Sequence, residues 1–131
     1  MGLFNNLFGG KNGGEKKEVK QIPWIALTSL AQLDEINQNS NSKTQVIFKH
    51  STTCGISRMV LNMFTESYGL SDNQMNLYFL DLHSYRDISN EVGYKFQVMH
   101  QSPQLLIVKN GTTVAHASHG AITEIDLERY I

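Results

Sequence analysis

Short apolar runs alternate with stretches of helical period along the chain from Ile22 onward. The strand-like runs cover residues 24–28, 45–50, 77–82, 104–109 and 113–117. Stretches with apolar residues three or four positions apart follow the first, second, third and fifth of these runs. The predicted order of elements is therefore βα-βα-βα-ββα, and few topologies accommodate that order.

Local signals predict where these elements begin and end. Ser29 is placed to N-cap the first helix, and Gly69 is placed to C-cap the second. Thr123 and Asp126 form a capping-box-like start to a last helix. The dipeptide Asn110-Gly111 separates the last two strand-like runs, and it is the strongest short signal for a hairpin.

Three successive strand–helix units predict parallel strands joined by right-handed crossovers, and the hairpin adds an antiparallel edge. This order predicts an α/β protein with a thioredoxin-like fold, in which helices flank a mixed sheet. In that arrangement Pro103, just before the fourth strand, is expected to be cis and to face Cys54 across the site, and an ordinary trans proline that opens a strand is the alternative. Ser102 then offers backbone groups to an extended or thiol-bearing ligand.

The first 21 residues differ in composition from the rest of the chain. Five of the 10 glycines fall within the first fourteen positions, and a charged run follows at 15–18. Such a segment cannot bury enough surface to fold alone, so we expect a flexible tail at 1–21 and one domain at 22–131. The few apolar residues at its start bury little area, so we expect them to pack on the domain rather than to contact a membrane, and a weak membrane or partner anchor is the alternative. The segment lacks the pattern of a signal peptide.

The charge balance and the cysteine count exclude several function classes. Eleven Lys+Arg and twelve Asp+Glu give a formal net charge of -1, which argues against a nucleic-acid-binding protein. The chain has one cysteine, Cys54, so it cannot form an internal disulfide or a cysteine-rich zinc site. We expect no metal site, and the lone cysteine without an export signal suits a cytoplasmic protein.

Cys54 lies where the second strand-like run gives way to a helix. The first turn of a helix has unpaired N–H groups and the positive end of the helix dipole, and both favour a reactive thiolate. Ser57 stands three residues on, where a dithiol oxidoreductase has its second cysteine. Any disulfide on Cys54 must therefore join another molecule: a low-molecular-weight thiol, a client protein or a second copy. An inert buried thiol is the alternative.

Other side chains are candidates for the surroundings of Cys54. His100 and His119 fall in loops expected to converge on the cysteine, where they could contact carboxylates of a thiol ligand or tune the thiolate. Loop-capping histidines are the alternative. Lys49 either attracts an anionic ligand or is an exposed charge at a strand end. Four methionines are expected to fill the core or a groove: Met59, Met63, Met75 and Met99.

Four separated stretches resemble the monothiol bacilliredoxin family of the bacillithiol redox system. They are Phe48-Lys49-His50-Ser51, Thr53-Cys54-Gly55-Ile56-Ser57, His100-Gln101-Ser102-Pro103-Gln104 and Ser118-His119-Gly120-Ala121-Ile122-Thr123. The resemblance implies a thiol–disulfide oxidoreductase that removes bacillithiol from S-thiolated client proteins, with Cys54 as nucleophile. Bacillithiol is then a co-substrate, and there is no resident cofactor. Thiol-ligand or client contacts are expected from eight residues: Thr53, Gly55, Ile56, Ser57, His100, Ser102, Pro103 and His119.

Residue 55 is glycine, whereas the family that the chain resembles usually has proline at this position. Glycine loosens the first turn and adds an N–H donor near the sulfur, which bears on redox potential and thiol preference. The sequence Cys-Gly-x-Ser is also similar to the Cys-Gly-Phe-Ser signature of monothiol glutaredoxins, which carry iron–sulfur clusters. Ile56 replaces that phenylalanine, and the second-glycine and Asp motif is not visible around Ser118-His119-Gly120. A cluster carrier and a redox-inert thioredoxin-fold interaction module are the alternative hypotheses.

Overall fold

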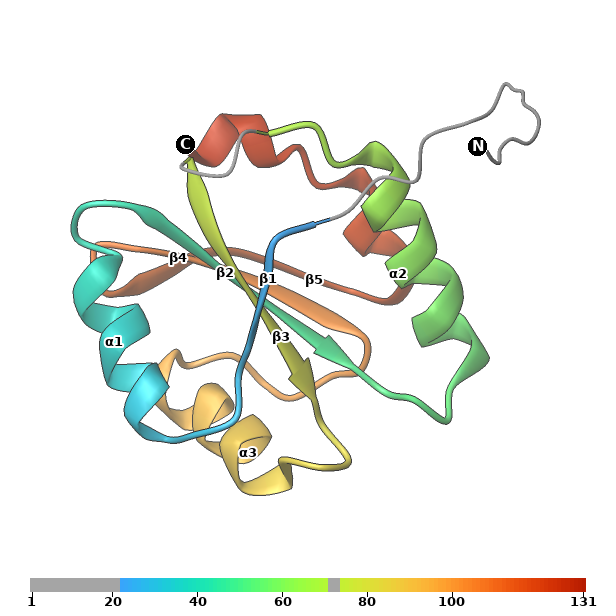
Figure 1. Ribbon diagram of the computed structural model, residues 1–131, viewed down its shortest axis with the longest axis horizontal. Coiled ribbons are helices and arrows are strands. Elements are labelled where there is room, and N and C mark those ends of the chain that lie inside the picture. The colour runs from blue at the N-terminus through green and yellow to red at the C-terminus, as the bar shows by residue number, and fades with distance from the viewer. Residues whose placement is uncertain (1–21, 71–73) are drawn as a thin grey trace, which may run out of the picture.

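The computed structural model describes residues 22–70 and 74–131, and the predicted tail lies outside these residues. A mixed five-stranded sheet in the order β1-β3-β2-β4-β5 forms the centre (Figure 1). The strands are β1 (Trp24–Ala26), β2 (Thr44–His50), β3 (Met75–Asp81), β4 (Gln104–Lys109) and β5 (Thr112–Ser118). β1 and β2 run parallel to β3, whereas β4 is antiparallel to β2 and β5 is antiparallel to β4. The predicted mixed sheet is confirmed.

Helices cover both faces of the sheet, as Figure 1 shows. They are α1 (Ala31–Asn39), α2 (Gly55–Ser67), α3 (Arg86–Lys95) and the 3₁₀ helices η1 (His119–Glu124) and η2 (Leu127–Tyr130). α1 and α3 pack with Ile47 in one apolar cluster, and α2, η1 and η2 pack with Val46 and Phe48 in the other. Successive residues of β2 thus point to opposite faces, as the strand period requires. Among the described residues, no helix is long and apolar enough to cross a membrane.

The predicted N-cap at Ser29 is wrong. α1 begins at Ala31 with Leu30 at the N-cap position, and no side chain of the N-cap residue caps the helix. Instead, Oε1 of Gln32 accepts hydrogen bonds from the backbone N–H groups of Thr28 and Ser29, at 2.7 and 3.0 Å. The Gln32 side chain, in the first turn of α1, therefore fixes the backbone of the residues that lead into the helix.

The predicted C-cap at Gly69 is also wrong. α2 ends at Ser67, and the C-cap residue Tyr68 is extended with φ −69° and ψ 126°. Because Tyr68 is buried in the cluster beneath α2, its side chain directs the chain out of the helix one residue before the glycine.

The last predicted helix is replaced by two short 3₁₀ helices. Ile122 and Leu127 both enter the apolar cluster beneath α2, and they are five residues apart. Positions i and i+5 of a continuous α-helix lie about 140° apart, so one helix could not place both on a single face. An extended residue, Ile125, separates η1 from η2. The Asp126 side chain then caps η2 by accepting a hydrogen bond from the Glu128 N–H.

The hairpin signal at Asn110-Gly111 is confirmed. Both residues have positive φ, 52° and 75°, which is the combination that a type I′ turn requires. The turn is fastened to the end of α1, where the Asn110 N–H donates to Ser40 O at 2.7 Å. The Gly111 N–H donates to Ser40 Oγ at 2.8 Å. The antiparallel edge of the sheet therefore depends on a glycine-specific turn that docks on a helix end.

We predict that Gly111→Ala lowers the free energy of unfolding by about 1 kcal/mol. Alanine is strained at φ +75°, and its Cβ would lie 3.1 Å from Asn37 Oδ1. Gly69→Ala is the matched control, since no atom lies within 4 Å of its Cβ position. The control is expected to change stability by less than about 0.5 kcal/mol in urea unfolding. Equal effects of the two substitutions would contradict the assignment.

Candidate active site

Cys54 stands at the N-cap position of α2, directly after the corner that follows β2. Its backbone is extended, with φ −109° and ψ 121°, and the side chain is half-buried. The corner is closed by a hydrogen bond from the Cys54 N–H to Ser51 O at 3.4 Å. The strand-to-helix position predicted for the cysteine is confirmed, so its sulfur lies at the amino end of a 13-residue helix.

Backbone donors of α2 lower the pKa of the Cys54 thiol below its ordinary value. The Ser57 N–H contributes most and the Ile56 N–H is next. Burial opposes them by raising the pKa, and the Ser57 hydroxyl adds a smaller lowering contribution. These donors hydrogen-bond the charged form, so they favour thiolate over thiol. The backbone donors that lower this pKa are therefore the Ser57 and Ile56 N–H groups.

Ser57 connects the sulfur to the end of β2. Its side chain is fully buried beneath the first turn of α2. Besides its effect on Cys54, the Ser57 Oγ accepts a hydrogen bond from the Ser51 N–H at 3.4 Å. Ile56 and Thr53, by contrast, are exposed on the surface beside the cysteine. Of these predicted contact residues, Ser57 therefore supports the sulfur from the interior, whereas Thr53 and Ile56 are accessible to a ligand at the surface.

The Ser102–Pro103 peptide bond is cis, as predicted. β4 begins one residue later, where Gln104 pairs with Lys49 of β2. The carbonyl of Pro103 accepts a hydrogen bond from the His119 N–H at 3.0 Å. The cis-proline and the start of η1 therefore lie at the same end of the sheet as the carboxyl end of β2, which leads to Cys54.

Lys49 is not the exposed strand-end charge that the sequence left open. β2 is paired on both sides, and α3 covers this face, so the lysine side chain is completely buried. Nζ donates hydrogen bonds to Ser89 O at 3.1 Å and to His100 Nδ1 at 3.2 Å. Burial lowers the pKa of Lys49 from 10.5 to about 8.

The two candidate histidines have different surroundings. His100 is exposed at the end of the α3–β4 loop, and it contacts Lys49 through Nδ1. Burial of part of its ring lowers the pKa of His100, and the charges of Lys49 and Arg86 lower it further. His119 is exposed and has a left-handed backbone, with φ 56°.

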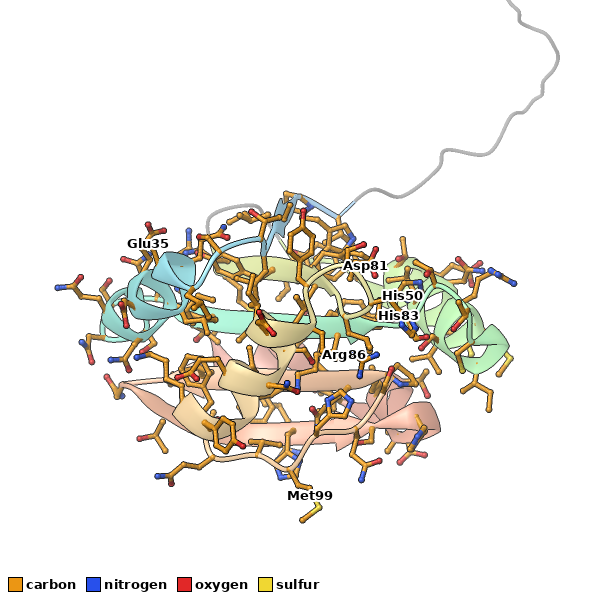
Figure 2. The ribbon with its side chains drawn as sticks, turned by 90° about the horizontal axis from the view of Figure 1, so that it is seen from below. Glu35, His50, Asp81, His83, Arg86 and Met99 are labelled. Atoms are coloured by element: carbon orange, nitrogen blue, oxygen red, sulfur yellow. The ribbon has the colours of Figure 1, made fainter. Side chains whose placement is uncertain are left out.

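Sequence reasoning missed His83. Its Nε2 lies 2.7 Å from Ser51 Oγ and 3.2 Å from Thr53 Oγ1, so it braces the corner that carries Cys54. His50, Asp81 and His83 lie at the end of the sheet where α2 is located (Figure 2). The sequence contains a feature that could have predicted this position. His83 follows the predicted third strand, and neighbouring parallel strands have their carboxyl ends at the same end of the sheet.

The expectation that the methionines fill the core or a groove holds for Met75, which is in the core, and for Met99, which borders a hollow, but not for Met59 and Met63. Met75 is buried, but Met59, Met63 and Met99 are 55%, 47% and 82% exposed. Met59 and Met63 follow Ile56 along the outer face of α2, because residues three and four apart share a helix face. Met99 borders a surface hollow together with His100. Within the described residues, no three His, Cys, Asp or Glu side chains are grouped to hold a metal ion.

One known protein family matches most of this chain. Residues 25–127 match the family model described as monothiol bacilliredoxin BrxC. The chain belongs to the monothiol bacilliredoxin family. For this bacilliredoxin, family and fold together support a function in thiol redox chemistry.

Solved structures confirm the thioredoxin-like fold of this bacilliredoxin. One described as a candidate oxidoreductase with a thioredoxin fold is 32% identical, with a TM-score of 0.64 over 76% of this chain and 85% of that chain. Thioredoxin from Malassezia sympodialis is 20% identical, with a TM-score of 0.65 over 88% of this chain and 94% of that chain. A Schistosoma mansoni thioredoxin pre-protein is 18% identical, with a TM-score of 0.61 over 82% and 98%. The two thioredoxins are similar in fold alone.

We predict that Gly55→Pro stabilises this bacilliredoxin and leaves the thiol pKa lowered. Gly55 is the first residue of α2, its Cβ position is free of contacts within 4 Å, and the preceding residue is extended. Reduced freedom of the unfolded chain should add about 0.5 kcal/mol to the free energy of unfolding. The pH dependence of Cys54 alkylation should stay the same, because the donors are Ile56 and Ser57. An upward shift of that alkylation midpoint would contradict this account.

We predict that Lys49→Met stabilises the fold most at neutral pH. The folded protein holds the pKa of Lys49 at about 8, below 10.5, so the unfolded chain binds more protons between these values. As the pH rises from about 8 to 10.5, the free energy of unfolding of the unaltered protein therefore increases relative to that of Lys49→Met. With allowance for residual screening, the difference should change by about 2 kcal/mol between pH 7 and pH 10.5 in urea unfolding. A pH-independent difference would show that Lys49 titrates normally.

Proposed function

We propose that this protein is a monothiol thiol–disulfide exchange enzyme that removes bacillithiol from mixed disulfides on client proteins. The observation that carries the proposal is the position of Cys54. It is a half-buried thiol at the amino end of α2 with its pKa lowered by two backbone donors, in a chain that has no second cysteine. Membership of the bacilliredoxin family supports the choice of thiol.

The exchange has two steps that balance in sulfur and protons. The Cys54 thiolate attacks the bacillithiol sulfur of the mixed disulfide. The client sulfur leaves as a thiolate and takes a proton from solvent, and a disulfide forms between Cys54 and bacillithiol. A second low-molecular-weight thiol then attacks the bacillithiol sulfur as its thiolate, which regenerates the Cys54 thiolate. The mixed disulfide on the client is thereby reduced at the expense of one free small thiol, which leaves as a disulfide with bacillithiol.

Each part of the site has a role in this scheme. The Ile56 and Ser57 donors favour the ionised form of Cys54 before attack and stabilise it as a leaving group afterwards. Ser57 cannot attack the mixed disulfide, so the small-thiol adduct persists until an external thiol arrives. The backbone of Ser102, beside the cis-proline, is suited to bind an extended ligand in the manner of an added strand. His119, tethered to Pro103, borders the same position.

The co-substrate and partners follow from this chemistry. Bacillithiol is a co-substrate that is bound transiently, and no resident cofactor is required. The partners are a low-molecular-weight thiol and S-thiolated client proteins, and the cytoplasm is the compartment in which such exchange operates.

The test is intact-mass spectrometry of the reduced protein after brief exposure to bacillithiol disulfide and, in parallel, glutathione disulfide. We expect a single bacillithiol adduct that forms faster than the glutathione adduct and is absent in Cys54→Ser. The same variant should lose all ability to release bacillithiol from an S-bacillithiolated client.

Three results would argue against the proposal. Retained release by Cys54→Ser would exclude the nucleophile, and equally slow labelling by both disulfides would exclude the thiol assignment. Visible absorbance after anaerobic iron–sulfur reconstitution, lost in Cys54→Ser, would favour a cluster carrier.

A further inference from the structure

Among residues 22–70 and 74–131, no carboxylate pairs with the buried ammonium group of Lys49. It donates hydrogen bonds to Ser89 O and His100 Nδ1, both uncharged acceptors. The single ion pair found within the described residues joins Lys95 to Asp34 and lies elsewhere. Burying a charge without a counter-charge is costly, and proteins seldom keep such a group unless it serves a purpose.

The contact with Lys49 determines where the proton of His100 lies. An ammonium group has three donors and no acceptor, so Nδ1 of His100 must accept the hydrogen bond. The neutral ring therefore carries its proton on Nε2. Because His100 is exposed while Lys49 is completely buried, the lysine acts from beneath and leaves the Nε2–H free to serve as a donor at the surface.

The loop that carries His100 is fixed beside the cis-proline. Gln104, which pairs with Lys49 across β2 and β4, donates from Nε2 to Met99 O at 2.9 Å. Its Oε1 accepts a hydrogen bond from the Gln101 N–H at 3.4 Å. His100 lies between these two anchored residues, at the edge of the sheet where the chain also turns into Cys54. His100 is thus held in place by the hydrogen bonds of its two neighbours and by the contact of its own ring with Lys49.

The charged groups that shift the pKa of His100 are both positive. Lys49 and Arg86 both lower its pKa, and no carboxylate is among the groups that shift it. Arg86 is the first residue of α3, whose N-cap residue Tyr85 provides no side-chain cap. In the view of Figure 2, Arg86 lies between His83 and Met99 on this side of the molecule. A donor N–H surrounded by cationic groups is suited to bind a carboxylate.

From this geometry we infer that His100, positioned by Lys49, forms a subsite for a carboxylate of the small thiol that exchanges with Cys54. The inference rests on the proposed function and names its substrate class, which is an anionic, carboxylate-bearing thiol. In this arrangement Lys49 is a positioning residue that assigns the tautomer of His100 and supplies positive potential. The bound carboxylate in turn provides the counter-charge that Lys49 lacks.

The test compares two disulfides that differ only in their carboxylates: glutathione disulfide and the same compound with its carboxylates capped as ethyl esters. The rate of adduct formation on Cys54 is measured for each with the full-length protein, and both are referred to the rates for free cysteine. We expect the acid to react about tenfold faster than the ester after this correction, as for one hydrogen bond to a charged group.

Four variants separate positioning from packing. Lys49→Met and His100→Ala should lower the acid-to-ester ratio to about one, while the rate with the ester changes by less than twofold. His100→Gln should keep most of the preference, because its amide N–H replaces the Nε2 donor. Lys95→Met is the control for net charge, since it removes a lysine that pairs with Asp34 on the surface, and it should leave the ratio unchanged.

Nitrogen NMR of the imidazole provides a readout that does not depend on exchange. The unaltered protein should show His100 as the Nε2–H tautomer, and Lys49→Met should show a mixture of tautomers. An unchanged ratio in Lys49→Met, or an equal loss with both disulfides, would overturn the inference. If Lys49→Met does not fold, the His100→Ala and His100→Gln pair decides it. Failure of the proposed function has a different signature: Cys54 would react with bacillithiol disulfide no faster than free cysteine does.

Discussion

Burial of the whole of β2 is the constraint on which the rest of the structure depends. All seven residues of this strand are buried, since β3 and β4 pair with its two edges and helices cover its two faces. The strand ends abruptly at a polar corner, and that corner presents Cys54 to the first turn of α2. The same burial forces Lys49 into the interior on the opposite face. One strand therefore fixes the positions of both Cys54 and the buried charge of Lys49.

The thiolate of Cys54 is favoured by the local geometry of a helix terminus rather than by a charged neighbour. The Ser57 and Ile56 N–H groups have no partner within the helix, so they are available to the sulfur as soon as α2 forms. Ser57 adds a buried hydroxyl that also contacts the end of β2. Because these groups belong to the backbone and to a core side chain, surface substitutions around the cysteine leave the activation largely intact.

Features set by local period and by steric restriction could be predicted from the sequence. The alternation of strands and helices, the Asn110-Gly111 turn and the strand-to-helix position of Cys54 all follow from such rules, and the structure confirms them. The cis state of Pro103 followed from the predicted fold. Features that depend on tertiary packing were missed or misplaced. The last helix broke in two because Ile122 and Leu127 both had to reach one cluster.

Side chains of the site were harder to predict than its backbone. Lys49 looks like a strand-end charge until the pairing of β2 with β4 and the cover provided by α3 are known. His83 has no motif of its own, and its contact with Ser51 and Thr53 exists because β3 runs beside β2. Both contacts join segments more than 25 residues apart, so no local pattern in the sequence carries them.

In the proposed exchange, the serine at position 57 also determines the kinetic order of turnover. In a dithiol protein the second cysteine attacks within the same molecule, so a trapped adduct escapes at a rate that concentration does not affect. With Ser57 buried in that place, escape from a disulfide on Cys54 requires a collision and is second order. The fraction of Cys54 held as an adduct therefore rises as free thiol becomes scarce. The occupancy of this one sulfur follows the balance between reduced and oxidised thiol around the protein.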